Sequence, residues 1–90
     1  MIIFTDHAKD KILKELNKLK ITEQTVMEIM REPGELLYDS LTNRFVAIGR
    51  SRNIAVIYEK ANGDFIVVTV IYSNELIDVA NKRKRSGRWI

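Results

Sequence analysis

The sequence predicts an α+β domain in which two N-terminal helices pack on a four-stranded, mainly antiparallel sheet, followed by a short C-terminal helix or tail. Apolar residues before Pro33 recur at the 3.6-residue period of a helix, whereas residues 44–72 contain three runs of β-branched and aromatic residues. Asn62-Gly63 separates the last two runs, and this pair tolerates the positive φ angles that a type I′ hairpin turn requires. Helices followed by strands are typical of a segregated α+β fold.

The first helix is expected from about Asp6 to Lys18, with an N-terminal cap from Thr5 or Asp6. Its apolar face consists of Ala8, Ile12, Leu16 and Leu19, and Leu13 widens that face. The second helix begins after Thr22, which is a good capping residue. It ends before Pro33, because the residue before a proline avoids the helical region.

Four strands are expected after the helices. Residues 36–38 form a short strand, and residues 39–43 form the turn that leads into the three longer runs. Residues 65–72 contain no charge, which indicates a central strand buried on both faces. Residues 2–4 are too few to distinguish an edge strand from an apolar staple beneath the first helix.

Two-residue hairpin loops at Asn62-Gly63 and Ser51-Arg52 predict the register of the sheet. The predicted pairs are Tyr58 with Val67, Val56 with Thr69, Phe45 with Tyr58, and Arg44 with Glu59. The same alternation places Ile71 on the face of Phe45 and Val70 on the opposite face. Both faces are mainly apolar, so helices or the C-terminal segment must cover much of each.

The composition indicates one small domain spanning residues 1–90, of which 46% are hydrophobic. The absence of cysteine excludes disulfides, thiolate metal sites and cysteine nucleophiles. No signal-peptide pattern is present, and no uncharged run approaches the ~20 residues of a membrane span, so a cytoplasmic location without membrane contact is expected. A domain of this size has marginal stability, which is consistent with a homodimer or a bound partner.

The net charge of +3 is concentrated in the last fifth of the chain. Residues 1–72 form a neutral body with ten basic and ten acidic side chains, and residues 73–90 carry the whole excess. The candidate nucleic-acid-binding residues are Arg52, Lys82, Arg83, Lys84 and Arg85, because a local basic patch favours phosphate binding. Trp89 and Ile90 either pack back on the domain or stack on a partner.

No strong catalytic motif is present: the chain lacks a phosphate-binding glycine loop, a zinc-protease motif and an acidic cluster for two metals. With a single histidine, no metal ion or cofactor is expected. Arg50 could bind a phosphate and stabilise the charge that develops during its cleavage, and Tyr58 or His7 could transfer a proton. The structural alternatives are a helix-terminus contact for His7 and a cross-strand ion pair for the nearby Arg44.

Several short motifs along the chain resemble a small prokaryotic domain family of unassigned function, which is related to the RelE/ParE toxin superfamily and to BrnT-like toxins. The motifs are His7-Ala8-x-x-Lys11-Ile12, Ile21-Thr22, Pro33, Arg44-Phe45-Val46-Ala47-Ile48-Gly49, Ile57-Tyr58-Glu59, Ile66-Val67-Val68-Thr69 and Arg88-Trp89. The resemblance implies a compact helix–helix–sheet fold, metal-independent mRNA cleavage with or without the ribosome, and neutralisation by an antitoxin protein. Lys11 stands where the family often has an arginine, which binds phosphate bidentately.

Three readings of the function follow. The first is a toxin-type, metal-independent endoribonuclease of a toxin–antitoxin system, with Arg50, Tyr58, Arg88 and His7 as catalytic residues. The second is a non-catalytic RNA-binding or regulatory module that uses the basic C-terminal segment. The third is a structural or dimerisation domain. RNA or the ribosome is the expected partner in the first two, and the sequence leaves all three open.

Overall fold

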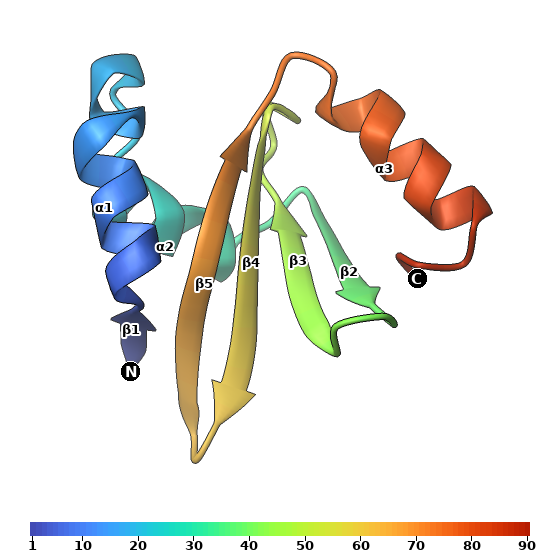
Figure 1. Cartoon of the computed structure of the whole chain (residues 1–90), viewed down its shortest axis with the longest axis horizontal. Coiled ribbons are helices and arrows are strands. Elements are labelled where there is room, and N and C mark those ends of the chain that lie inside the picture. Colours follow the sequence, from blue (N-terminus) through green and yellow to red (C-terminus); the bar gives the residue numbers. More distant parts are fainter.

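The computed structural model describes residues 1–90 as three α-helices, one short 3₁₀ helix and a single five-stranded sheet (Figure 1). The elements are β1 (Ile2–Phe4), α1 (Asp6–Lys14), η1 (Leu16–Leu19), α2 (Glu23–Arg31), β2 (Glu35–Asp39), β3 (Arg44–Ile48), β4 (Ile54–Ala61), β5 (Asp64–Tyr72) and α3 (Leu76–Arg85). The predicted α+β class is confirmed. None of the helices has the length and hydrophobicity that a membrane-spanning helix needs.

The sheet has five strands, so the prediction of four is wrong. Its order is β1-β5-β4-β3-β2, in which β1 pairs in parallel with β5 and all other pairs are antiparallel. The additional strand is β1, whose three residues carry too short a pattern to identify from sequence. Its pairing with residues 65–67 of β5 places it at the edge of the sheet.

Local capping rules explain both N-terminal helices. The Thr5 hydroxyl accepts a hydrogen bond from the Ala8 amide at 3.1 Å, and Thr22 forms a reciprocal capping box with Thr25. The first helix ends at Lys14 instead of near Lys18, because the chain tightens into the 3₁₀ helix η1 after that residue. The second helix ends before Pro33, as predicted.

The predicted register is correct up to one irregularity. Tyr58 lies opposite Val67, Phe45 lies opposite Tyr58, and a 2.8 Å ion pair joins Arg44 to Glu59. Asn62 and Gly63 have φ angles of 52° and 83°, as a type I′ turn requires.

A β-bulge beyond the Tyr58–Val67 pair overturns the rest of the register predicted between β4 and β5, whereas the register between β3 and β4 is as predicted throughout. The ladder shifts between Ile57 and Tyr58, so Val56 pairs with Val70 and not with Thr69. An extra residue in one strand moves each side chain after it to the opposite face of the sheet. Val70 therefore belongs to the first core and Ile71 packs against the second, the opposite of the predicted assignment.

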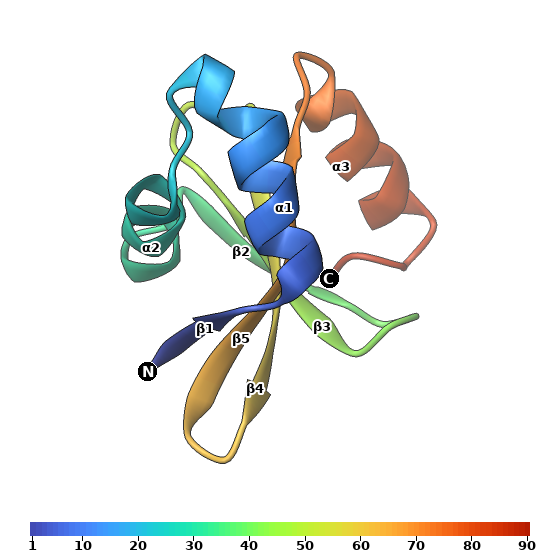
Figure 2. The same cartoon turned by 60° about the vertical axis from the view of Figure 1, so that its left-hand side comes forward.

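The sheet separates two apolar cores. Helices α1 and α2 cover one face, and α3 covers the other (Figures 1 and 2). The first core is built around Ile12, Val26, Val56 and Val67, and the second around Ile48, Leu76 and Trp89. The expectation that both faces are covered is therefore confirmed.

The C-terminal segment is not a basic tail: it consists of helix α3 and a short stretch after it that returns to the sheet. The predicted short helix extends through the four consecutive cations to Arg85. Gly87, with a φ of 80°, then reverses the chain, and Ile90 exchanges two backbone hydrogen bonds with Tyr38 at the edge of β2. Trp89 is buried, so of the two predicted alternatives the packing of this residue is confirmed.

Candidate nucleic-acid interface

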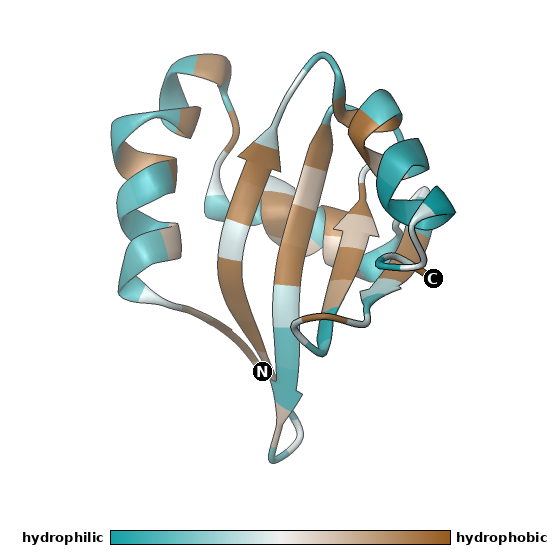
Figure 3. Ribbon diagram, turned by 45° about the vertical axis from the view of Figure 1, so that its right-hand side comes forward, coloured by the Kyte–Doolittle hydropathy of each residue, from teal (hydrophilic) through white to brown (hydrophobic).

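Four consecutive cations surround the last turn of α3, because successive helical residues are rotated by about 100°. Lys84 faces the sheet, where its Nζ lies 2.6 Å from Glu35 Oε2. Arg83 lies over the Trp89 ring, 5.1 Å from the ring centroid. Lys82 and Arg85 are exposed and have no ion-pair partner. The hydrophilic colouring of this turn contrasts with the apolar strands beneath it (Figure 3).

The position of α3 is fixed at both of its ends. Leu76 and Ala80, four residues apart on one face, are buried against the second core. After the helix, the Arg88 and Trp89 amides donate to the Arg83 carbonyl at 2.9 and 3.1 Å. The free cations are therefore presented from a rigid element of the fold.

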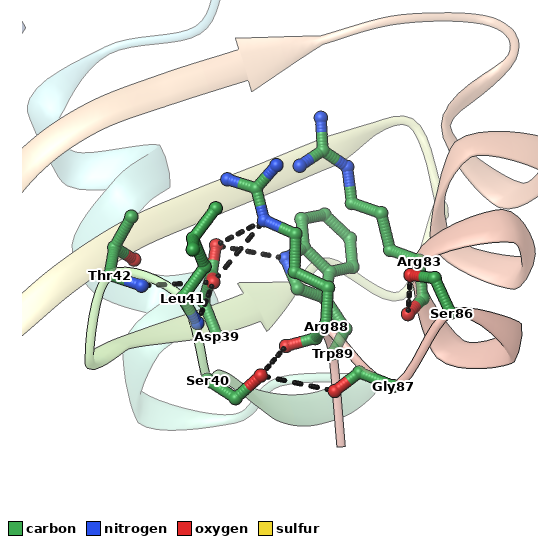
Figure 4. Close-up of polar contacts among 9 residues, drawn as sticks. All are labelled: Asp39, Ser40, Leu41, Thr42, Arg83, Ser86, Gly87, Arg88 and Trp89. Carbon is green, nitrogen blue, oxygen red and sulfur yellow. Dashed lines mark hydrogen bonds and ion pairs between the residues drawn. The ribbon is translucent and has the colours of Figure 1, made fainter.

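Asp39, at the end of β2, holds the returning C-terminal segment (Figure 4). Its carboxylate accepts hydrogen bonds from Arg88 Nε and Trp89 Nε1, each at 3.2 Å from Oδ2. The Leu41 and Thr42 amides donate to Oδ1 at 2.9 and 3.2 Å. Asp39 is the only charged residue that is buried, and every one of these contacts stabilises its charged form.

The hydrogen bonds to Asp39 outweigh the cost of its burial. Burial alone raises the pKa of the carboxyl, whereas the hydrogen bonds from Arg88, the Leu41 and Thr42 amides and Trp89 lower it. The result is a pKa lowered from 3.8 to about 2. Asp39 and Arg88 therefore form a structural ion pair that closes the second core.

Glu35, the first residue of β2, lies between the β3–β4 turn and α3 and contacts a cation from each. Arg52 Nη2 lies 3.9 Å from Glu35 Oε1, while Lys84 binds the other carboxylate oxygen. Glu35 Oε1 is enclosed and accepts no hydrogen bond. Two predicted nucleic-acid contacts, 32 residues apart in sequence, thus lie beside one carboxylate. We call Arg52 together with Lys82, Arg83, Lys84 and Arg85 the α3 basic surface.

Arg50 lies near the start of the same turn, where it is exposed and its Nη2 is 3.7 Å from Glu32 Oε2. It lines a hollow of about 230 Å³ with Arg52, Glu35 and the backbone of the two glycine-containing loops at Gly34 and Gly49. A Cβ at Gly34 would come within 3.1 Å of Arg50 Cα, so a larger residue there would have to push these loops slightly apart.

The structure places the other predicted catalytic residues on separate elements. Tyr58 is buried in the first core, where burial raises its pKa, and Arg88 is bound to Asp39 beyond α3. His7 is exposed in the first turn of α1, with Nε2 3.2 Å from Thr69 Oγ1. No hydrogen bond or ion pair joins any two of Arg50, Tyr58, Arg88 and His7.

His7 lies beside two lysines that are not among the predicted site residues, although Lys11 belongs to the motif that carries the family resemblance. It lines a hollow of about 400 Å³ with Lys11 and Lys14, the residues four and seven positions further along α1. Asp10 and Glu15 complete the lining, and Lys14 lies 4.0 Å from Asp10. The i, i+4, i+7 spacing was the available signal, since such residues share one face of a helix.

No cluster of three or more histidine and carboxylate side chains is close enough to hold a metal ion. Comparisons of the chain with protein-family models, with curated proteins and with solved structures found no match.

Proposed function

We propose that this chain binds RNA through the α3 basic surface. The observation that carries the proposal is the exposure of Lys82 and Arg85, two cations without a carboxylate partner on a helix that is fixed by its buried face. Unpaired cations held in place can contact successive phosphates, and each contact releases counterions from the nucleic acid. The preference for RNA over DNA rests on the resemblance to the RelE/ParE superfamily.

The distribution of charge supports the same surface. Residues 1–72 are neutral, so the long-range attraction to a polyanion comes from residues 73–90. Within that segment, Lys84 and Arg88 are engaged with Glu35 and Asp39. Lys82 and Arg85 are then the primary phosphate contacts, and Arg52 and Lys84 extend the positive surface toward the β3–β4 turn.

The test is a double substitution, Lys82→Ala with Arg85→Ala, measured by RNA-binding titrations over a range of salt concentrations. Each lost phosphate contact should reduce the slope of log K against log salt by about 0.7 for single strands, so two contacts remove about 1.4. The matched control is Lys9→Ala with Lys18→Ala, which removes the same charge from exposed positions outside the α3 basic surface. An unchanged slope in the first variant, or an equal change in the control, refutes the proposed surface. Absence of salt-dependent RNA binding by the unchanged protein favours a structural or dimerisation role.

A second candidate is the toxin-type, metal-independent endoribonuclease that the family resemblance implies. The observation that favours it is the hollow beside α1, which brings the only histidine together with Lys11 and Lys14. Cleavage by the ribose 2′-hydroxyl requires proton transfer and stabilisation of the phosphate charge, but no metal ion. His7 would move the proton, and Lys11 would stabilise the charge. An antitoxin partner belongs to this candidate, whereas a homodimer is compatible with any of the three readings.

The endoribonuclease is tested in two separate reactions of the purified protein, one with free mRNA in EDTA and one with mRNA and ribosomes in a magnesium buffer that keeps the ribosome assembled. Cleavage of free mRNA should persist in EDTA, and DNA, which lacks the 2′-hydroxyl, should stay intact. His7→Ala should reduce the rate by about 10²–10⁴, the usual contribution of a general acid or base. Lys9→Ala, on α1 but outside the hollow, should leave the rate unchanged. Intact mRNA under both conditions, with harmless overexpression in a bacterial host, refutes this candidate and leaves RNA binding as the proposed function.

A further inference from the structure

An apolar hollow of about 270 Å³ lies on the first-core face of the sheet, on the side opposite to α3. It is formed where the end of α2 approaches β1 and the β4–β5 hairpin. Its lining residues are Met1, Ile2, Met27, Met30, Arg31, Tyr58 and Phe65. Methionine side chains adapt to ligands of different shape, so Met27 and Met30 give the hollow an adjustable wall.

The Tyr58 hydroxyl has no partner in the protein. The side chain is only 5% exposed, yet its hydroxyl makes no hydrogen bond. The hydroxyl oxygen is not enclosed either, since Glu35 Oε1 is the one enclosed side-chain polar atom without a partner. Phe45 stacks on the Tyr58 ring with centroids 5.4 Å apart, and Phe65 contacts its edge at 5.7 Å. The ring is therefore held in one orientation while its hydroxyl is left unsatisfied.

Arg31 is the only charged side chain that lines this hollow. It is exposed at the last residue of α2 and forms no ion pair. A guanidinium group and a phenol hydroxyl are both hydrogen-bond donors, and the pKa of Tyr58, raised by burial, keeps its hydroxyl protonated. The polar groups of the hollow thus offer donors and a positive charge, and no side-chain carboxylate competes for them.

We propose that this hollow binds a small aromatic or branched apolar carboxylate, with the apolar group between Met27, Met30 and Phe65 and the carboxylate facing Arg31 and the Tyr58 hydroxyl. The size is suitable, because an apolar cavity of about 150 Å³ holds benzene and the larger volume here has room for a short arm. The carboxylate satisfies both donors, which an uncharged ligand with a single acceptor does not. The site lies on the opposite face of the sheet from the α3 basic surface and does not depend on RNA binding.

The test is a titration with 3-phenylpropionate, followed by NMR through the methyl resonances of the methionines and the backbone amides. Saturable shifts confined to the residues that line the hollow, among them Met1, Met27 and Met30, are expected. The uncharged 3-phenylpropionamide is the matched probe and should bind at least about tenfold more weakly, because it lacks the charge that strengthens the hydrogen bonds. No saturable shift at millimolar 3-phenylpropionate, or equal binding of the two probes, overturns the proposal.

Two conservative variants locate the contacts. Tyr58→Phe keeps the ring and removes only the hydroxyl, whereas Arg31→Gln removes the charge at an exposed position. Each should weaken the binding of 3-phenylpropionate about tenfold and reduce the difference in affinity between the two probes. Arg85→Gln on α3 is the control for nonspecific attraction and should bind as the unchanged protein does. Amide spectra of each variant establish that it is folded, and unaltered affinity in both Tyr58→Phe and Arg31→Gln also overturns the proposal.

Discussion

Asp39 shows how one side chain determines the position of a whole segment. Its carboxylate joins a turn that follows it directly in sequence to Arg88 and Trp89, which lie 49 and 50 residues away. A buried carboxylate is costly unless donors surround it, and here four groups donate to it. The charged form is therefore more stable in the folded chain than in the unfolded chain.

This difference predicts how stability depends on pH. The folded pKa of Asp39 is about 2, below its unfolded value of about 3.9, so its contribution is complete above pH 4 and is lost as the pH falls through 2. A shift of two pKa units corresponds to about 2–3 kcal/mol in the free energy of unfolding. The stability advantage of the unchanged protein over Asp39→Asn should shrink by about that amount between pH 5 and pH 2. Urea unfolding at several pH values measures it.

The control for the pH experiment is Asp10→Asn, an exposed carboxylate on α1. Its stability relative to the unchanged protein should vary little over the same range, because surface ion pairs contribute at most about 1 kcal/mol. If the free energies of unfolding of the unchanged protein and of Asp39→Asn differ by a constant amount from pH 5 to pH 2, the pKa of Asp39 is not lowered.

At the scale of elements, α3 and the β4–β5 hairpin differ in how far local sequence specifies them. The hairpin turn follows directly from Asn62-Gly63, whose backbone adopts the expected positive φ angles. The bulge next to Tyr58 has no comparable signal, although it decides which face Val70 and Ile71 occupy. Helix α3 is likewise longer than its sequence predicts, because a run of cations is compatible with either a helix or a solvated tail.

The consequence for α3 is that its cations have different roles despite their adjacency. Lys84 and Arg83 contact groups within the domain, and only Lys82 and Arg85 are free. Removal of residues 82–90 is therefore a poor test of nucleic-acid binding, since it also removes Trp89 from the second core. The paired substitutions on the exposed face of the helix avoid this difficulty.

At the scale of the molecule, one sheet serves two cores. Strand β4, for example, contributes Val56 to the first core and Ala55 to the second. Because both cores pack on the same sheet, neither can form without it. Such sharing couples the two halves of the protein during unfolding, as expected of a small domain.

The only tryptophan, Trp89, makes this coupling measurable. Tryptophan fluorescence reports the second core, whereas far-ultraviolet circular dichroism reports all helices and strands. The two urea-unfolding curves should coincide, because loss of the second core removes one face of the shared sheet. A fluorescence transition at clearly lower urea would falsify the coupling and show that the C-terminal segment opens independently.

The chain by itself determined the features that depend on neighbouring residues. Thr5 and Thr22 cap their helices, and the Arg44–Glu59 pair follows from the turn between their strands. These interactions require only that residues a few positions apart, or related by one tight turn, adopt their preferred geometry.

Only the tertiary structure decided which charges are free and which side chains lie together. Asp39 could not be connected with Trp89 from sequence, and nothing local separates the free Lys82 from the paired Lys84. Tyr58 is enclosed in the first core, while the His7 hollow is formed along a different element. The physical reason is that ion pairing, burial and the pKa of a side chain depend on groups brought together by packing across many residues, which no local pattern encodes.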